Sequence, residues 1–191
     1  MMNIYRLHSN PNALIGHTDR DFYFGDEAEE LILQGKEVTK NVIGSLNLQG
    51  TKITSLPDNL TVGGSLYLRG TKITSLPDNL TVSGNLYLGG TKITSLPDNL
   101  TVGWNLALNS TKITSLPDNL TVSGDLYLED TPITSLPDNL KVGGHLDLTN
   151  TLITSLPDNL KVGGNLDLSR TQYLDKNNLP SSLVVKGDII K

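Results

Sequence analysis

The side chains of this sequence that could take part in chemistry are few and unevenly placed. The chain of 191 residues has no cysteine, which excludes disulfides, thiolate metal ligands and a cysteine nucleophile. It has three histidines, so a metal site built from several histidines is not expected. Two of them, His8 and His17, stand near Asp19 and Asp21, a set with acid–base or ligand chemistry but with no recognisable motif spacing. An enzyme with its site in this N-terminal segment is therefore an alternative rather than the main expectation.

The remaining chemistry-bearing residues are tyrosines and carboxylates that recur at a fixed spacing. Tyr67, Tyr87 and Tyr127 stand at multiples of 20 residues, and Asp147 and Asp167 continue the series. Tyrosine is a rigid, amphipathic residue that is enriched at interfaces, and carboxylates attract basic groups. The recurrence indicates a binding surface, and it requires elements that hold these residues in register.

A 20-residue repeat sets this spacing. Six consecutive units begin at Thr51 and at every twentieth residue up to Thr151, and they cover 120 of the 191 residues. Each unit holds the pattern T-x-I-T-S-L-P-D-N-L-x-V, followed by L-x-L. Degenerate units flank the six at Val42–Leu48 and Leu183–Ile189, so the array has seven to eight turns. One such unit cannot bury its apolar side chains alone and needs its neighbours above and below.

Apolar residues alternate with other residues inside each unit. Leu60 with Val62, and Leu66 with Leu68, predict short strands with one buried face. The S-L-P-D-N segment predicts a turn, and glycines at 63–64 and 70 predict corners because glycine tolerates positive φ. Successive units then stack as parallel strands, and the threonine that opens each unit should form an inward ladder of hydroxyls. The inward apolar side chains of one turn are Ile73, Leu76, Leu80, Val82, Leu86 and Leu88.

The segment L-x-L-x-x-T-x-I-T-S-L-P-D-N-L resembles the bacterial leucine-rich repeat, L-x-L-x-x-N-x-L-x-x-L-P-x-x-L, over about Asn41–Leu168. The period and the repeated Leu-Pro are similar to the short-repeat class found in secreted bacterial effectors. Threonine stands where the family has its ladder asparagine, and six residues rather than three separate Leu60 from Leu66. The wider spacing gives room for an extra strand at Leu60–Val62, which favours a triangular β-solenoid over a horseshoe. Some of those effectors carry a ubiquitin-ligase domain with a cysteine nucleophile, an activity that a chain without cysteine does not share.

The expected fold is mostly β: a parallel-stranded leucine-rich-repeat or β-solenoid with a small α+β N-terminal cap. We expect an N-terminal capping segment at 1–40, the solenoid at 41–170 and a C-terminal cap at 171–191, because an open turn exposes both core and strand edge.

The N-terminal segment carries its own secondary-structure patterns. A helix is expected near 26–35, with Asp26 at the N-cap and Gly35 at the C-terminus. Strands are expected at Ile4–Leu7 and Phe22–Phe24.

Variation between the units is concentrated at the outward positions around L-x-L. The position inside this motif changes from tyrosine to aspartate along the array, so an aromatic zone grades into an acidic one. This gradient is typical of a docking surface for a partner with apolar and basic groups. The alternative is that tyrosine simply suits an exposed strand face. The predicted partner-binding residues are Tyr67, Arg69, Tyr87, Trp104, Tyr127, Glu129, Asp147 and Asp167.

Three further features lie outside this gradient. Trp104 replaces a glycine at a corner, where it is either packed or an exposed anchor. A row of lysines from Lys52 to Lys112 is expected to be a solubilising edge, and its loss at Pro132 and Leu152 leaves a small apolar patch. The aspartates at the turns are expected to form those turns rather than a calcium site. They are Asp58, Asp78, Asp98, Asp118, Asp138 and Asp158.

These features together predict a non-enzymatic protein-interaction module with no cofactor and no metal. A net charge of -5 argues against a nucleic-acid binder, and no apolar run reaches the roughly 18 residues of a membrane span. We expect a protein partner, with the solenoid edges as a route to homo-oligomers. The N-terminus lacks the apolar region of a signal peptide, which predicts a cytoplasmic protein or one delivered to a host cell without a cleavable signal. Near-identical tandem units are typical of bacterial or phage accessory proteins, and a nucleic-acid mimic or binder is a further alternative.

Overall fold

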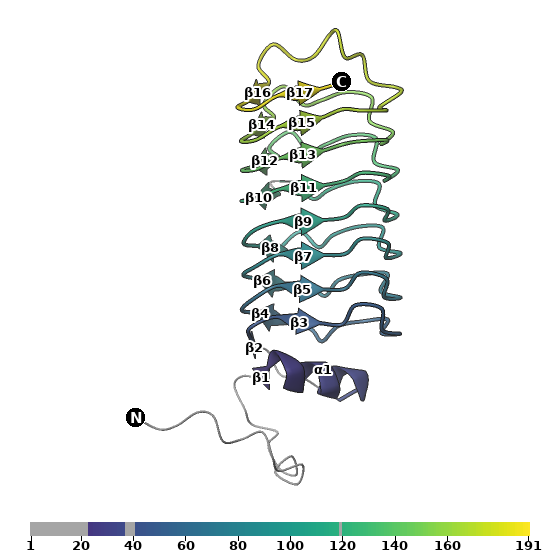
Figure 1. The fold of residues 1–191 in the computed structure, drawn as a ribbon, viewed down its shortest axis with the longest axis vertical. Coiled ribbons are helices and arrows are strands. Elements are labelled where there is room, and N and C mark those ends of the chain that lie inside the picture. The colour runs from purple at the N-terminus through teal and green to yellow at the C-terminus, as the bar shows by residue number, and fades with distance from the viewer. Residues whose placement is uncertain (1–22, 37–40, 119) are drawn as a thin grey trace, which may run out of the picture.

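The structure is a computed structural model, and it describes residues 23–36, 41–118 and 120–191. It shows a mostly β solenoid of about eight stacked turns, with a small helix at the N-terminal end of the stack (Figure 1). All strand pairs are parallel. This confirms the fold class. The predicted strand at Ile4–Leu7 and the side chains of His8, His17, Asp19 and Asp21 lie outside the described residues.

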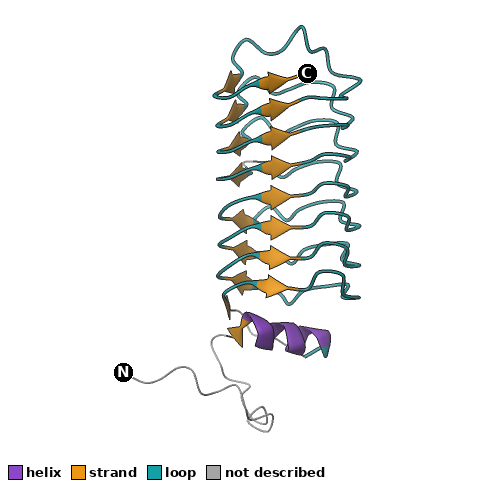
Figure 2. Cartoon of the chain, in the orientation of Figure 1, coloured by secondary structure: helices purple, strands orange, loops and turns teal. Residues whose placement is uncertain are grey.

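Each turn of the coil contributes two short strands, which belong to different sheets (Figure 2). The strand after the S-L-P-D-N-L turn is the additional one that the six-residue spacing predicted. In successive turns it is β2 (Asn41–Ile43), β4 (Thr61–Val62), β6 (Thr81–Val82), β8 (Thr101–Val102), β10 (Thr121–Val122), β12 (Lys141–Val142), β14 (Lys161–Val162) and β16 (Val184–Val185). The L-x-L strand is β3 (Leu46–Asn47), β5 (Leu66–Tyr67), β7 (Leu86–Tyr87), β9 (Leu106–Ala107), β11 (Leu126–Tyr127), β13 (Leu146–Asp147), β15 (Leu166–Asp167) and β17 (Ile189–Ile190).

The N-terminal end of the stack carries β1 (Tyr23–Phe24), which pairs with β2, and α1 (Gly25–Leu33). The prediction of Asp26 as N-cap is wrong, because Phe24 occupies that position and Asp26 lies in the first turn. There its charge still interacts favourably with the helix dipole. At the C-terminal end of α1, the Gly35 N–H donates to Ile32 O and the Lys36 N–H donates to Leu31 O. This is the pattern of a glycine-terminated Schellman motif.

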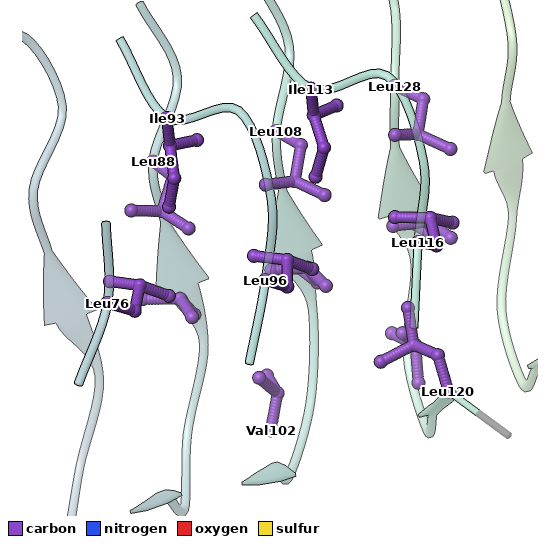
Figure 3. Close-up of a cluster of buried hydrophobic side chains, with 14 of the residues drawn as sticks. Leu76, Leu88, Ile93, Leu96, Val102, Leu108, Ile113, Leu116, Leu120 and Leu128 are labelled. Atoms are coloured by element: carbon purple, nitrogen blue, oxygen red, sulfur yellow. The ribbon is translucent and has the colours of Figure 1, made fainter. Parts of the chain in front are cut away.

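The core is a set of aliphatic columns that run along the stack. Leu76, Leu96 and Leu116 take equivalent places in successive turns and form one such column (Figure 3). The six inward positions predicted for one turn, from Ile73 to Leu88, are all buried. Each fully buried aliphatic side chain stabilises the fold by roughly 1.5–3 kcal/mol relative to an exposed one.

The threonine that opens each unit points inward, as predicted. From Thr71 onward these side chains are at most 4% exposed, and the Oγ1 of Thr71 donates to Leu68 O at 2.8 Å. The bond therefore closes a corner within one turn rather than joining two turns. Thr91 is the exception, since its buried Oγ1 has no hydrogen-bond partner. The same hydroxyl bond is made by Thr51, Thr111, Thr131, Thr151 and Thr171.

The two corners of each turn make different demands on the backbone. At the corner after L-x-L the chain adopts positive φ, which is near 70° at Gly70. This corner also accepts other residues, since Arg170 adopts a φ of 58° at the equivalent place. For Gly64 the predicted reason was wrong, because its φ is not positive. A Cβ on Gly64 would instead lie 2.7 Å from the carbonyl carbon of Gly44, so this corner requires glycine for close approach of two turns.

A ladder of side-chain acceptors joins the turns at the position before L-x-L. The backbone N–H of each residue there bonds the side chain of the residue one turn earlier, for example Asn105 N–H to Asn85 Oδ1 at 3.0 Å. Variation at this position is therefore limited to residues that present an acceptor close to the backbone. We refer to this set as the acceptor ladder: Ser45, Ser65, Asn85, Asn105, Asp125, His145 and Asn165.

Replacing Asn85 by alanine should lower the free energy of unfolding by about 1 kcal/mol, because the Asn105 N–H loses its acceptor. Replacing Asn85 by serine should cost less, since Ser65 already performs this role one turn earlier. Urea unfolding followed by circular dichroism measures both. Equal losses for the alanine and serine variants would contradict the role of the ladder.

Candidate functional site

The sheet of L-x-L strands brings five of the eight predicted residues into one row. Consecutive register pairs place Tyr67 beside Tyr87, and Tyr127 beside Asp147, which in turn lies beside Asp167. All five side chains are half-buried. Ala107 occupies the place between Tyr87 and Tyr127. We call this series from Tyr67 to Asp167 the tyrosine row, and its strands β5 to β15 follow one another along the stack (Figure 1).

The aromatic end of the row is preorganised. The rings of Tyr67 and Tyr87 are stacked, with centroids 4.9 Å apart and planes at 16°. Ala107 is only 8% exposed although it occupies an outward position, because larger side chains stand on both sides of it. The row therefore presents a two-ring platform, one position without a ring, and a third tyrosine.

Tyr127 is fixed by its neighbours. Its hydroxyl donates to Asp125 Oδ2 at 2.9 Å. Burial raises the pKa of Tyr127 to about 12, and the hydrogen bond and charge of Asp125 add to the effect. The phenol therefore stays protonated at neutral pH. The other carboxylate oxygen of Asp125 accepts the His145 N–H as part of the acceptor ladder.

The aspartates of the row also have a local structural role. Asp147 Oδ1 accepts the Thr149 N–H, and Asp167 Oδ1 accepts the Ser169 N–H, both at 2.8 Å. Partial burial acts to raise the pKa of Asp167, but hydrogen bonds from Ser169 and Thr149 outweigh it and hold that pKa below its ordinary value. Asp167 is therefore ionised at neutral pH.

Glu129 lies in an unfavourable electrostatic position. Partial burial raises the pKa of its carboxyl, and the charge and hydrogen bond of Asp147 raise it further. Asp130 acts in the same direction, while Arg69 opposes it as the smallest of these influences. Ionised Glu129 is thus crowded by like charges, a repulsion that a basic group from a partner would relieve.

The predicted residues do not form a single cluster. Arg69 and Glu129 stand two residues after Tyr67 and Tyr127, along one border of the row. Trp104 is apart from the row, at the corner between β8 and β9, and it is 64% exposed. Trp104 is therefore exposed rather than packed at the corner, and its role as an anchor stays a prediction.

The charged side chains outside the tyrosine row lie at the surface of the described residues. The lysines from Lys52 to Lys112 are exposed, as are the turn aspartates from Asp58 to Asp158. Within the described ranges no three His, Asp or Glu side chains lie close enough together to hold a metal ion. The helix described there has nine residues and is too short to cross a bilayer.

Two features of this surface escaped the sequence interpretation. Variation at the acceptor ladder is restricted, because every residue of the ladder carries an acceptor near its Cβ. Ala107 interrupts the tyrosines, and its place between Tyr87 and Tyr127 is visible from the repeat alignment alone.

Replacing Glu129 by glutamine should make the protein more stable at pH 7, by about 0.3–0.5 kcal/mol. The folded protein holds the Glu129 proton more tightly than the unfolded chain does, so ionisation of Glu129 costs stability once the pH rises through its folded pKa. The advantage of the variant should vanish below about pH 4, where the unfolded carboxyl is also protonated. Urea unfolding across this pH range tests the sign, and an advantage that persists unchanged at low pH would contradict it.

Comparisons with known proteins add no relative to this description. No protein-family model matches the sequence, and none of the curated proteins compared with it is similar enough to count as a match. The structure itself shows a parallel β-solenoid with 20-residue repeats and with ladders of threonine and leucine. Function therefore has to be argued from the surface of this chain.

Proposed function

We propose that this protein is a non-enzymatic interaction module that binds a protein partner through the tyrosine row and its acidic border. One observation carries the proposal: the outward residues change along the row while core and turn residues repeat, and the row begins with the stacked pair Tyr67 and Tyr87. A surface that served only to solubilise the sheet would need neither this order nor stacked rings.

The aromatic end is suited to carry the affinity. Tyrosine gives a large contact area at a small cost in conformational entropy. Stacking of Tyr67 on Tyr87 has already restricted both rings before a partner arrives. The hydrogen bond from Tyr127 to Asp125 restricts the third. Less order is therefore lost on binding than for flexible side chains.

The acidic end is suited to select the partner. Asp167 is ionised, and Glu129 and Asp147 repel each other. A basic group placed opposite them gains attraction and also removes this repulsion. The partner surface should therefore be apolar opposite Tyr67 and Tyr87 and basic opposite Asp147. Charge of this kind mainly accelerates association and weakens with added salt.

Several finer assignments belong to this proposal as well. The repeat motif supports membership of the leucine-rich-repeat class, and the near-identity of the tandem units supports an accessory role in a bacterium or phage, in the cytoplasm or in a host cell. A nucleic-acid mimic would use the same carboxylates but would not need the stacked tyrosines. An enzyme would place its chemistry at His8, His17, Asp19 and Asp21.

Replacing both Tyr67 and Tyr87 by alanine should weaken partner binding at least about tenfold while the protein still folds, because the rings are half exposed and the sheet beneath them is built from leucines. The matched control replaces Lys52 and Lys72 by alanine, which changes exposed side chains in the same units outside the row. The partner is captured from lysate with the intact protein, purified, and titrated against each variant by calorimetry.

The tyrosine variant should lose affinity and the lysine variant should keep it. Unchanged affinity in the tyrosine variant, with normal circular dichroism, would remove the tyrosine row from the proposal.

A further inference from the structure

The sheet made by the first strand of each turn is interrupted at one place within the described residues. Strands β2 to β8 pair in order, as do β10 to β16, but β8 and β10 do not pair with each other. At each of the other steps from β2 to β16, a backbone hydrogen bond of 2.8–3.0 Å joins the two neighbouring turns. At the step from β8 to β10, no hydrogen bond joins the Ser123 N–H to Val102 O. The bonds that cross the other steps are Gly63 to Val42, Ser83 to Val62, Gly103 to Val82, Gly143 to Val122, Gly163 to Val142 and Lys186 to Val162.

Trp104 stands beside the interruption, where neighbouring turns have glycine. A Cβ on Gly84 would lie 2.8 Å from the backbone of Gly64 in the preceding turn, so a side chain at this corner crowds the turn before it. The bond from Gly103 N–H to Val82 O in that preceding turn is nevertheless intact at 2.9 Å. Trp104 makes two backbone hydrogen bonds at this corner: its N–H donates to Gly84 O at 3.2 Å, and its carbonyl accepts the Gly124 N–H at 3.3 Å. The equivalent bonds in the other turns measure 2.7–3.0 Å, so these two are the longest of the series.

A groove of about 670 Å³ lies at this step. The core beneath it is less completely covered than elsewhere, since Val102 is 6% exposed and Leu100 is only partly buried. Val102 and Leu120 belong to adjacent turns at this place (Figure 3). The residues that line the groove are Asp98, Leu100, Thr101, Val102, Gly103, Pro117, Asp118, Leu120, Thr121 and Ser123. We call it the Trp104 groove, because Trp104 follows directly on Gly103.

The chemistry of the Trp104 groove is specific. Two carboxylates, Asp98 and Asp118, line it, and no basic side chain does. Val102 and Ser123, whose carbonyl and N–H are not joined to each other, both line it. The exposed indole beside it is the side chain that attracts cations most strongly through its ring face.

We propose that the Trp104 groove binds an extended, basic segment of a partner protein. An arginine or lysine of that segment lies between Asp98 and Asp118 and beside Trp104. This site belongs to a different sheet from the tyrosine row and does not depend on the function proposed for that row.

A labelled peptide tests this site directly. The probe is a fluorescein-labelled nine-residue peptide in which arginine alternates with threonine, and its affinity for the intact protein is measured by fluorescence anisotropy. A peptide with glutamate in place of arginine should not bind. Trp104 is the sole tryptophan, so a change in its intrinsic fluorescence on adding the unlabelled arginine peptide reports contact at the groove itself.

A matched pair of variants separates the groove from general charge attraction. Replacing Asp98 and Asp118 by asparagine should weaken binding about tenfold, whereas replacing Asp58 and Asp78, which hold the same place in earlier turns and do not line the groove, should change it by less than about twofold. Replacing Trp104 by glycine, the residue at the neighbouring corners, should remove the indole beside the groove and also weaken binding about tenfold. If that variant does not fold, the aspartate pairs decide.

Four results would overturn the proposal. They are failure of the intact protein to bind the arginine peptide, equal losses for the two aspartate pairs, full binding by a folded Trp104→Gly variant, and loss of binding when Tyr67 and Tyr87 are replaced by alanine. The last result would place the peptide on the tyrosine row. Retained peptide binding in the tyrosine variant, with loss in the Asp98 and Asp118 variant, supports the groove whatever becomes of the tyrosine row.

Discussion

Hydrogen bonds between residues twenty positions apart hold this molecule together, and nearly every other feature depends on them. The backbone of each turn bonds the next along the sheet of L-x-L strands and, except between β8 and β10, along the other strands as well. The acceptor ladder adds a side-chain bond at each step, as from Asn105 N–H to Asn85. Because the turns are stacked in register, the side chains that face the core repeat from unit to unit. Glycine at Gly64 and Gly84 allows the close approach, and Thr71 closes its corner.

This constraint also determines where function can reside. Residues that face the core repeat almost unchanged, so differences between units collect at the outward positions and at some corners. There the register that holds the core together also places Tyr67 on Tyr87 and brings the charges of Glu129 and Asp147 together. The tyrosine row is thus a direct product of the stacking, and its order along the axis follows the order of the units in the chain.

Much of the fold and of the tyrosine row could be predicted from the sequence. The spacing of the apolar residues gives the period of the repeat and shows which side chains are buried. The alternation of Leu60 with Val62 and of Leu66 with Leu68 predicted both strands of a turn, and the spacing of the tyrosines predicted the row. The start of α1 at Gly25 was missed, since Asp26 is equally favourable in a first turn. The close approach of the turns at Gly64 and Gly84 could not be predicted, because it depends on distances below 3 Å at a corner whose glycines were explained by φ.

The central claim is that main-chain pairing is continuous along the described turns except between β8 and β10, the step beside Trp104. Amide hydrogen exchange measured by NMR tests it at single residues, because exchange of a paired amide requires local opening. The account predicts that Ser123 exchanges at least about tenfold faster than Ser83 and Gly143, which hold the same place in turns with intact bonds. Equal protection of the three amides would contradict it.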